Sequence, residues 1–188
     1  MVAQSGMIGF SFNSSKTNIL AKAIRFFTSS KFSHCFLVID PVLDEPAVIE
    51  ASEIVQVIPL ARYFEFKDES FLLFSLPVAD KAKVDSAVAA IFFYHSGMKY
   101  GYFELLWFLW SWLVKKVFGK VIKKGNPFRA GIICTEVVWH YINALGGEYA
   151  KCVSEFDPDT ISPYDLEQIV KARPDLFKLE YSKGIEWK

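Results

Sequence analysis

The chain has 188 residues, and its 21 Lys and Arg residues balance its 21 Asp and Glu residues, so the formal net charge is zero. This balance argues against a nucleic acid as the main partner, because proteins that bind that polyanion usually carry an excess of basic residues. Apolar residues make up 52% of the chain and aromatic residues 16%, which excludes a disordered tail or linker and favours one domain, residues 1–188, with a sizeable core.

Short β-prone segments dominate the first half of the chain. Runs of apolar and β-branched residues that end at Pro or at polar residues predict five strands: Met7–Phe12, Phe32–Ile39, Ala47–Ala51, Ile54–Pro59 and Phe71–Leu76. A helix is expected between the first two strands, over Thr17–Phe27, with Ser14 and Ser15 as candidates for its N-cap.

Longer helical segments follow. Asp80–His95 predicts a helix with Asp80 as its N-cap and Gly97 just after its end. Further helices are expected over Tyr102–Ile122, over Cys134–Leu145, and from Ser162 onward with Pro163 in the first turn. Because the strands come first and the long helices later, the order predicts the α+β class, with helices packed on an antiparallel sheet.

The three cysteines, Cys35, Cys134 and Cys152, are an odd number for a disulfide scaffold and indicate free thiols in a reducing compartment. Their spacing from one another and from the histidines does not match a metal site, so neither a metal nor another cofactor is expected. Residues Met1–Phe12 lack the basic and long apolar regions of a secretory signal peptide. We therefore expect a cytoplasmic protein.

Cys134 stands where a helix is expected to begin. The periodic apolar positions of that helix start at Val137, directly after the cysteine. At a helix N-terminus the dipole and the unpaired N–H groups favour a thiolate and lower the thiol pKa, and the same N–H groups can bind an oxyanion. The alternative is that Cys134 is a small buried residue at the start of a core helix.

A nucleophilic cysteine needs a base and a group that orients this base. His34 is the candidate base, because it lies in an otherwise apolar strand; a buried structural histidine is the alternative. Glu50 is the candidate orienting group, since a carboxylate in an apolar strand is costly unless it is paired, and an edge strand with Glu50 in water is the alternative. His140 lies over a turn beyond Cys134 on another face of the same helix, and His95 ends a helix, so both are interpreted as structural.

Four segments, taken in order, resemble the circularly permuted NlpC-like papain-fold proteins of the YiiX/YaeF-like group. They are Ile24–Leu37 with its Thr-Ser-Ser-Lys-Phe-Ser-His run, Val48-Ile49-Glu50-Ala51, Ile133-Cys134-Thr135-Glu136, and Ser162-Pro163-Tyr164-Asp165-Leu166. The resemblance covers residues 8–170. The order His before Glu before Cys marks the permuted group, since ordinary papain-like enzymes place the cysteine first.

This resemblance implies a permuted papain-like fold with the nucleophile at a helix N-terminus. The implied roles are Cys134 as nucleophile, His34 as general base and acid, and Glu50 as the orienting residue. Tyr100 falls where the family often has a Tyr beside an Asp, which implies that it lines the site. Gly101 stands where that Asp is common, and Thr135 replaces the usual Ser, so the sequence departs from the family pattern at two positions.

An aromatic-rich helical insertion is expected at residues 100–124, and eight aromatic residues fall within residues 100–118. Read as a helix, this segment is apolar on both sides, which is typical of a buried helix or of one in an apolar environment, and Trp with a basic tail is typical of an interfacial membrane helix. Three interpretations stay open: a core helix, an acyl-chain pocket or peripheral membrane contact through Tyr102–Phe118, and a dimer surface. In the pocket interpretation Trp107 and Trp110 bind the substrate together with Tyr100.

The leading functional hypothesis is a cysteine peptidase or amidase that cleaves an amide bond through an acyl-enzyme. Its partner would be a peptide or acyl-amide substrate, lipid-linked in one version of the hypothesis. The second hypothesis is a thioesterase, lipase or acyltransferase acting on a lipid or acyl substrate, because the resembled group is related to lecithin:retinol acyltransferase-like proteins. The third is a binding module on the same fold that has lost catalysis. The sequence leaves the substrate and the oligomeric state open.

Overall fold

The structure is a computed structural model that describes residues 3–15, 18–42, 45–119 and 131–187. Six strands form one sheet in the order β4-β3-β2-β1-β5-β6, and each pair of neighbours is antiparallel. The strands are β1 Ile8–Asn13, β2 His34–Val42, β3 Glu45–Ala51, β4 Val55–Pro59, β5 Glu69–Ser75 and β6 Lys178–Lys183. The predicted α+β class with an antiparallel sheet is therefore confirmed.

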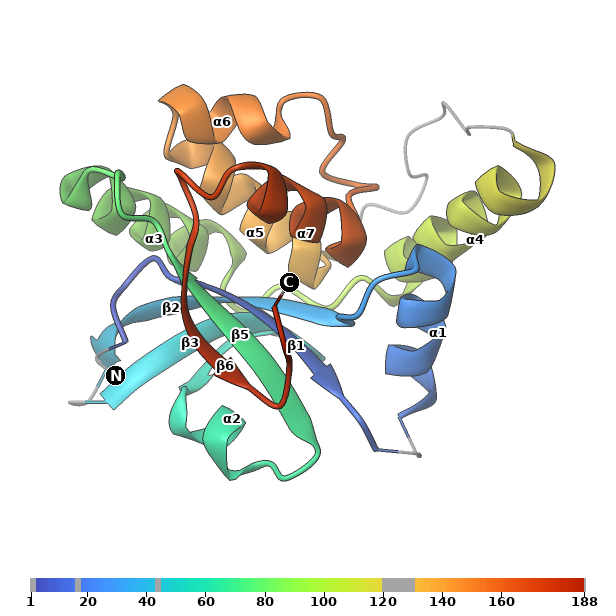
Figure 1. Ribbon diagram of the computed structural model, residues 1–188, viewed down its shortest axis with the longest axis horizontal. Coiled ribbons are helices and arrows are strands. Elements are labelled where there is room, and N and C mark those ends of the chain that lie inside the picture. The colour runs from blue at the N-terminus through green and yellow to red at the C-terminus, as the bar shows by residue number, and fades with distance from the viewer. Residues whose placement is uncertain (1–2, 16–17, 43–44, 120–130, 188) are drawn as a thin grey trace.

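Helices cover both faces and one end of this sheet (Figure 1). One face carries α3 Lys81–His95, α5 Cys134–Ala144, α6 Gly147–Val153 and α7 Pro163–Ala172. The opposite face carries the short α2, Ala61–Glu65. Two further helices, α1 Ile19–Thr28 and α4 Tyr102–Phe118, pack against each other at one end of the sheet.

Each face of the sheet has its own core, because side chains alternate along the strands. In β2, Cys35 and Leu37 point to the face covered by α5, whereas Phe36 and Val38 point to the face covered by α2. Gly9 on β1 pairs with Phe36, and a Cβ atom on Gly9 would lie 2.1 Å from the Phe36 ring. A glycine is required there so that the ring can lie flat against β1.

The predicted strands are all present, with ends that differ by a few residues. Two predicted helix starts are also confirmed. The Asp80 side chain accepts a hydrogen bond from the Lys83 N–H at 3.0 Å, and Ser162 and Asp165 form a reciprocal capping box with Pro163 in the first turn. These starts were readable because a cap acts within one turn of the chain.

The predicted N-cap of α1 is wrong. Asn18 caps this helix, with its Oδ1 atom accepting from the Ala21 N–H at 3.0 Å. Ser14 instead donates a hydrogen bond to the Asp68 carbonyl at 3.1 Å, and the Ser15 N–H donates to the Asn13 side chain at 2.8 Å. The two serines make hydrogen bonds at the end of β1 and do not cap the helix, which begins two residues later than expected, at Ile19.

The sequence reasoning missed α2, α6 and β6 and extended α4 too far. α4 ends at Phe118 rather than Ile122, and residues 120–124 of the expected insertion lie outside the described residues. The single domain with an insertion at residues 100–124 stays a prediction. Within the described part of the chain, no helix combines the length and the hydropathy that crossing a membrane requires.

Candidate active site

Cys134, His34 and Glu50 come together at one end of the sheet. Cys134 is the first residue of α5 and His34 the first residue of β2, and α5 packs on β2 and β3. Nε2 of His34 lies 3.4 Å from Oε2 of Glu50, and the side chains of His34 and Cys134 are hydrogen-bond partners. With Nε2 directed at the carboxylate, Nδ1 is the nitrogen left for the thiol.

The surroundings of Cys134 favour a thiolate. Burial alone would raise the pKa of this thiol, but its hydrogen bond to His34 and the positive charge of that imidazole outweigh burial and lower the pKa. Backbone N–H groups of Cys35 and Thr135 also donate to the sulfur and act in the same direction. The position at the helix N-terminus adds the favourable end of the dipole.

His34 and Glu50 are held in their charged forms. Burial would lower the pKa of His34, but the Cys134 thiolate and the Glu50 carboxylate outweigh it and raise the pKa to about 10. Burial would raise the pKa of Glu50, but its contacts with His34, Tyr63 and Gln56 lower it to about 2. The three pKa shifts therefore act in the direction of a thiolate, an imidazolium and a carboxylate in a row.

Tyr63 and Gln56 hold the carboxylate of Glu50. The Tyr63 hydroxyl donates to Oε2 of Glu50 at 2.5 Å, and Nε2 of Gln56 donates to Oε1 at 3.0 Å. Burial and the charge of Glu50 raise the pKa of Tyr63 well above its ordinary value, so its hydroxyl keeps the proton that it donates. Both oxygens of the buried carboxylate are thus satisfied, as a buried charge requires.

The sequence reasoning missed both of these residues. Gln56 lies directly opposite Glu50 in the β3–β4 pair, and its polar side chain in an apolar strand was a readable signal. Tyr63 lies on α2, which carried no periodic pattern long enough to be recognised. The end of α2 is fixed from β6, where Nζ of Lys183 donates to three carbonyls, those of Tyr63, Phe64 and Phe66.

A cavity of about 410 Å³ opens beside His34 and Glu50. Its wall is mostly apolar and aromatic with a few carboxylates, and it includes Leu20, Ile24, Glu53, Tyr63, Phe66, Glu69, Tyr100 and Tyr102. Tyr100, which the resemblance placed at the site, is part of this wall, and its role in substrate binding stays a prediction. Cys134 is only 4% exposed and is not part of this wall, so an acyl group must reach its sulfur past the side chains that cover it.

Trp107 and Trp110 are not among the described residues that line this cavity. Both lie on α4, where Trp110 is 54% exposed. Their predicted role in substrate binding stays a prediction.

The segment that leads into Cys134 is joined to the start of α4 through backbone. Ile132 pairs with Tyr100 in a parallel bridge, and a Cβ atom on Gly131 would lie 2.6 Å from the Cα atom of Gly101. Oε1 of the buried Glu104 accepts a hydrogen bond from the Gly131 N–H at 2.8 Å. This close approach requires glycine at position 131. At position 101, where the resembled family commonly has Asp, a Cβ atom would lie 2.8 Å from Oε2 of Glu104, which is a structural reason for glycine there.

Comparisons with known proteins support the fold. A scan of protein-family models gives no match, and neither does a search of curated proteins. Among solved structures, the chain is similar to the metalloprotein YiiX from Escherichia coli O157:H7 (DUF1105), with a TM-score of 0.52 and 18% sequence identity over 98% of each chain. The chain has a YiiX-like fold.

In this YiiX-like fold the other histidines lie apart from the thiol. Nε2 of His140 is 3.7 Å from the Glu136 carboxylate, and its ring stacks on His95 with 5.2 Å between centroids. Burial and the neighbouring His140 lower the pKa of His95. His140 and His95 thus pair with each other, so His34 is the histidine that the structure places at Cys134.

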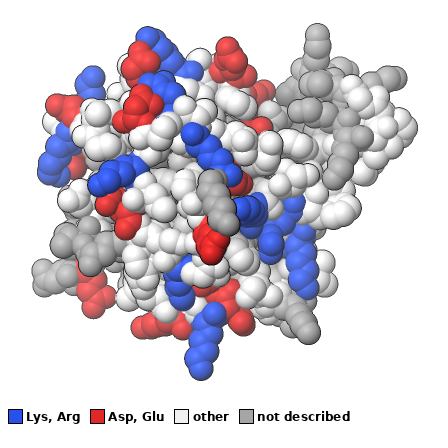
Figure 2. All heavy atoms as spheres, in the orientation of Figure 1, with Lys and Arg blue, Asp and Glu red and all other residues white. Residues whose placement is uncertain are grey.

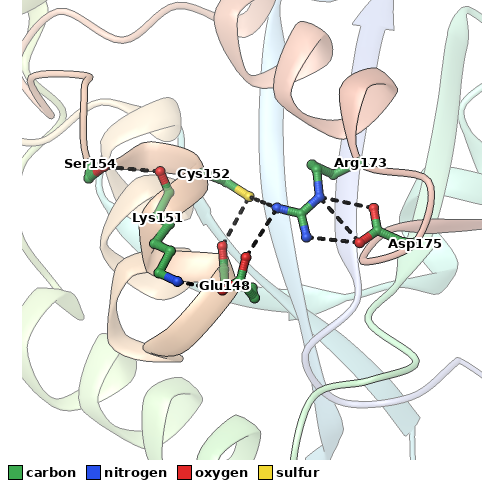
Figure 3. Close-up of polar contacts among 6 residues, drawn as sticks. All are labelled: Glu148, Lys151, Cys152, Ser154, Arg173 and Asp175. Carbon is green, nitrogen blue, oxygen red and sulfur yellow. Dashed lines mark hydrogen bonds and ion pairs between the residues drawn. The ribbon is translucent and has the colours of Figure 1, made fainter.

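The other two cysteines have environments that favour the neutral thiol. Cys35 is buried, and both burial and the charge of Cys134 raise its pKa. The Cys152 thiol donates to the Glu148 carbonyl at 3.1 Å and accepts from Nη1 of Arg173 at 3.5 Å (Figure 3). Burial is the largest effect on Cys152, and its pKa is raised.

Proposed function

We propose that the chain is a cysteine hydrolase that cleaves an amide bond through an acyl-enzyme. In this proposal Cys134 is the nucleophile, His34 the general base and acid, and Glu50 the residue that orients the imidazole. The observation that carries it is the row of a low-pKa thiol, an imidazole and a buried carboxylate 3.4 Å from that imidazole. Charged groups placed in this way activate a thiol and prepare a proton for the leaving group.

The proposed reaction has two steps. The Cys134 thiolate attacks the carbonyl carbon, a C–S bond forms, and N–H groups in the first turn of α5 stabilise the oxyanion. The His34 imidazolium then gives its proton to the amine as the C–N bond breaks. In the second step His34 takes a proton from water, the hydroxide attacks the thioester, and the acid leaves as the thiolate is regenerated.

We further propose that the fold is the circularly permuted NlpC-like version of the papain fold. Two observations support this assignment. The base on β2 and the carboxylate on β3 precede the nucleophile on α5 along the chain, and four sequence segments follow the order of the permuted group. The likeness to YiiX supports the fold at a coarser level.

YiiX is described as a metalloprotein, so the fit of a metal to this chain needs a test. Among the residues that the structure describes, no group of three or more His, Cys, Asp or Glu side chains is placed to hold one ion. The residues present do not fit such a centre, and the proposed reaction uses no metal-dependent step. We expect a chelator to leave the reaction rate unchanged.

A second candidate function is hydrolysis or transfer of a lipid acyl group. One observation favours it: the cavity wall includes Leu20 of α1 and Tyr102 of α4, and both belong to exposed apolar parts of these helices. The same thioester intermediate would form, and either water or a second nucleophile would take the acyl group from Cys134.

The nucleophile assignment is tested by labelling with a fluorescent iodoacetamide at mildly acidic pH, where ordinary thiols react slowly. We expect the parent chain to be labelled at one site and Cys134→Ala to lose this label while keeping its thermal unfolding midpoint. Cys152→Ser is the matched control and should keep the label. Equal labelling of Cys134→Ala and the parent chain would refute the assignment. In a separate experiment, rates on a panel of amide, ester and thioester substrates distinguish the two candidate functions.

A further inference from the structure

α4 is apolar on two sides: one side packs against the rest of the protein, and the other is exposed to solvent. Leu105 is buried, and Leu109 and Trp112 pack against the main core. The opposite side carries large apolar residues at helical spacing, of which Phe103 is 65% and Leu106 60% exposed, and it continues through Trp110 and Val117. Such a surface is unusual for a helix that faces only water.

α1 extends this surface, because it packs against α4 at the same end of the molecule (Figure 1). Ile19 is 78% exposed and Phe26 69% exposed, seven residues apart on one side of α1. We call these six residues, Ile19, Phe26, Phe103, Leu106, Trp110 and Val117, the α1–α4 apolar surface. Exposed apolar residues gathered at one end of a molecule in this way often mark an interaction site.

Basic residues outnumber acidic residues in the sequences of α1 and α4. α1 carries Lys22 and Arg25 and no acidic residue, and the sequence of α4 has Lys115 and Lys116 shortly before its end at Phe118. The one acidic residue of α4, Glu104, is buried and faces Gly131. In Figure 2 the described atoms of the projection that α4 forms are white, so its visible described surface is uncharged.

We propose that the α1–α4 apolar surface docks on an anionic lipid bilayer. Exposed Phe, Leu and Trp on a helix that lies along the protein suit insertion into the headgroup region, and the basic residues of α1, Lys22 and Arg25, suit anionic headgroups. The charges of Lys22 and Arg25 favour this occupant over a second copy of the chain, in which the same two basic residues would face each other.

The position of the cavity gives this docking a consequence for the substrate. Leu20 and Tyr102, at the starts of α1 and α4, belong to the cavity wall and are 42% and 50% exposed. The docked surface therefore brings the cavity mouth toward the lipid, so that a lipid-linked acyl group can enter it without crossing water. This statement about the substrate rests on the proposed hydrolase function, whereas the docking itself does not.

Co-sedimentation with vesicles tests the docking, using the Cys134→Ala chain so that thiol chemistry plays no part. We expect binding to vesicles of phosphatidylglycerol mixed with phosphatidylcholine and much weaker binding to pure phosphatidylcholine. The combined variant Phe103→Ser, Leu106→Ser and Trp110→Ser should lower the fraction bound at least about tenfold, since each change removes exposed apolar area. Phe93→Ser is the matched control, because Phe93 on α3 is also highly exposed, and it should bind as the parent does.

Each outcome decides the proposal. Loss of binding in the combined variant, with a blue shift of Trp fluorescence on vesicles that only the parent and Phe93→Ser show, supports it. Absence of vesicle binding by the parent overturns it, and so does equal binding to neutral and anionic vesicles. A parent dimer in sedimentation velocity that the combined variant loses would assign the surface to self-association instead. None of these results depends on whether Cys134 is a nucleophile.

Discussion

Cys134 and Cys152 are both helical cysteines that contact a basic side chain, yet their pKa values move in opposite directions. His34 next to Cys134 lowers the pKa of that thiol, whereas the pKa of Cys152 is raised although Arg173 contacts its sulfur. Burial is the largest cause at Cys152. Figure 3 shows a further one, because Arg173 is shared with Asp175 at 2.8 Å and Glu148 at 3.7 Å.

The difference shows that a nearby cation does not by itself activate a thiol. The charge of Arg173 is largely neutralised by two carboxylates, Asp175 and Glu148, and these carboxylates also repel a Cys152 thiolate. The carboxylate behind His34 instead lies on the far side of the imidazole and holds its charge in place. Cys134 is also the first residue of its helix, whereas Cys152 is near the end of α6, where the dipole disfavours an anion.

Removing the imidazole of His34 should have the largest effect on the difference between Cys134 and Cys152. We expect His34→Ala to lower the hydrolysis rate by about a thousandfold or more, because both the activating charge and the proton donor are lost. Burial of Cys134 is then opposed only by the backbone N–H groups and the helix dipole, so the midpoint of its alkylation rate against pH should move upward. His140→Ala serves as the control and should change neither quantity; a large effect of that variant would mean that the base is misassigned.

Glu50→Gln should have the next largest effect, a fall in rate of about a hundredfold, since a weaker partner for His34 lowers the pKa of the imidazole. It should also change how stability depends on pH. In the parent chain the contribution of Glu50 is full above its ordinary pKa and is lost as pH falls toward about 2. The contribution of His34 is full below its ordinary pKa and is lost as pH rises toward about 10.

Urea unfolding of the parent and of Glu50→Gln across this pH range measures the loss of stability at acid pH and at alkaline pH. The variant should lack the acid-side loss that Glu50 causes, and its alkaline-side loss should begin at a lower pH than in the parent. Curves of identical shape would show that Glu50 does not interact with His34 in solution.

Tyr63→Phe should have a smaller effect, a fall in rate of about three- to tenfold, because the Glu50 carboxylate loses one of its two donors and keeps Gln56. The phenyl ring should still pack on Phe36, whose ring centroid lies 4.3 Å from that of Tyr63. A structural role alone would lower the unfolding midpoint without shifting the pH profile of Cys134 alkylation. We expect that profile to shift, since Tyr63 acts through the charge of Glu50.

Asp175→Asn tests the other side of the comparison and should have the smallest effect. Removing this carboxylate frees part of the Arg173 charge for Cys152, so the pKa of Cys152 should fall. The rate of Cys152 alkylation against pH, measured in a Cys134→Ala background, reports the change. Hydrolysis by the chain with Cys134 intact should be unaltered, and a loss of hydrolysis would mean that the Arg173 cluster contributes to the reaction.

Much of the fold was predictable from local signals. Strand runs, the Asp80 cap and the Ser162-Pro163 start depend on residues within one turn or one strand. The misplaced cap of α1 shows the limit, because Ser14 is engaged by Asp68, which lies far along the chain. β6 was missed because it is an edge strand rich in polar residues, so it has no apolar run of its own. Its position is determined by pairing with β5, far away in the sequence.

The candidate site was predictable to a similar degree. Cys134, His34 and Glu50 were identified from their positions at element starts and in apolar strands, and from the order of the resembled motifs. Tyr63 could not be identified in this way, because its role depends on the register between β3 and β4 and on α2 folding under the sheet. The burial of Cys134 and the exposure of one side of α4 likewise depend on tertiary packing, so they cannot be predicted from helical periodicity alone.

The chain order of the site also has a consequence for synthesis. The strands that carry His34 and Glu50 are made before α5, so a growing chain can pair base and carboxylate while it still has no thiol at position 134. When Cys134 is added, its pKa falls only after α5 has docked on β2 and met the imidazole. The low-pKa thiol is therefore formed only after the strands that carry His34 and Glu50, and β6, whose Lys183 fixes the end of α2, is added after it.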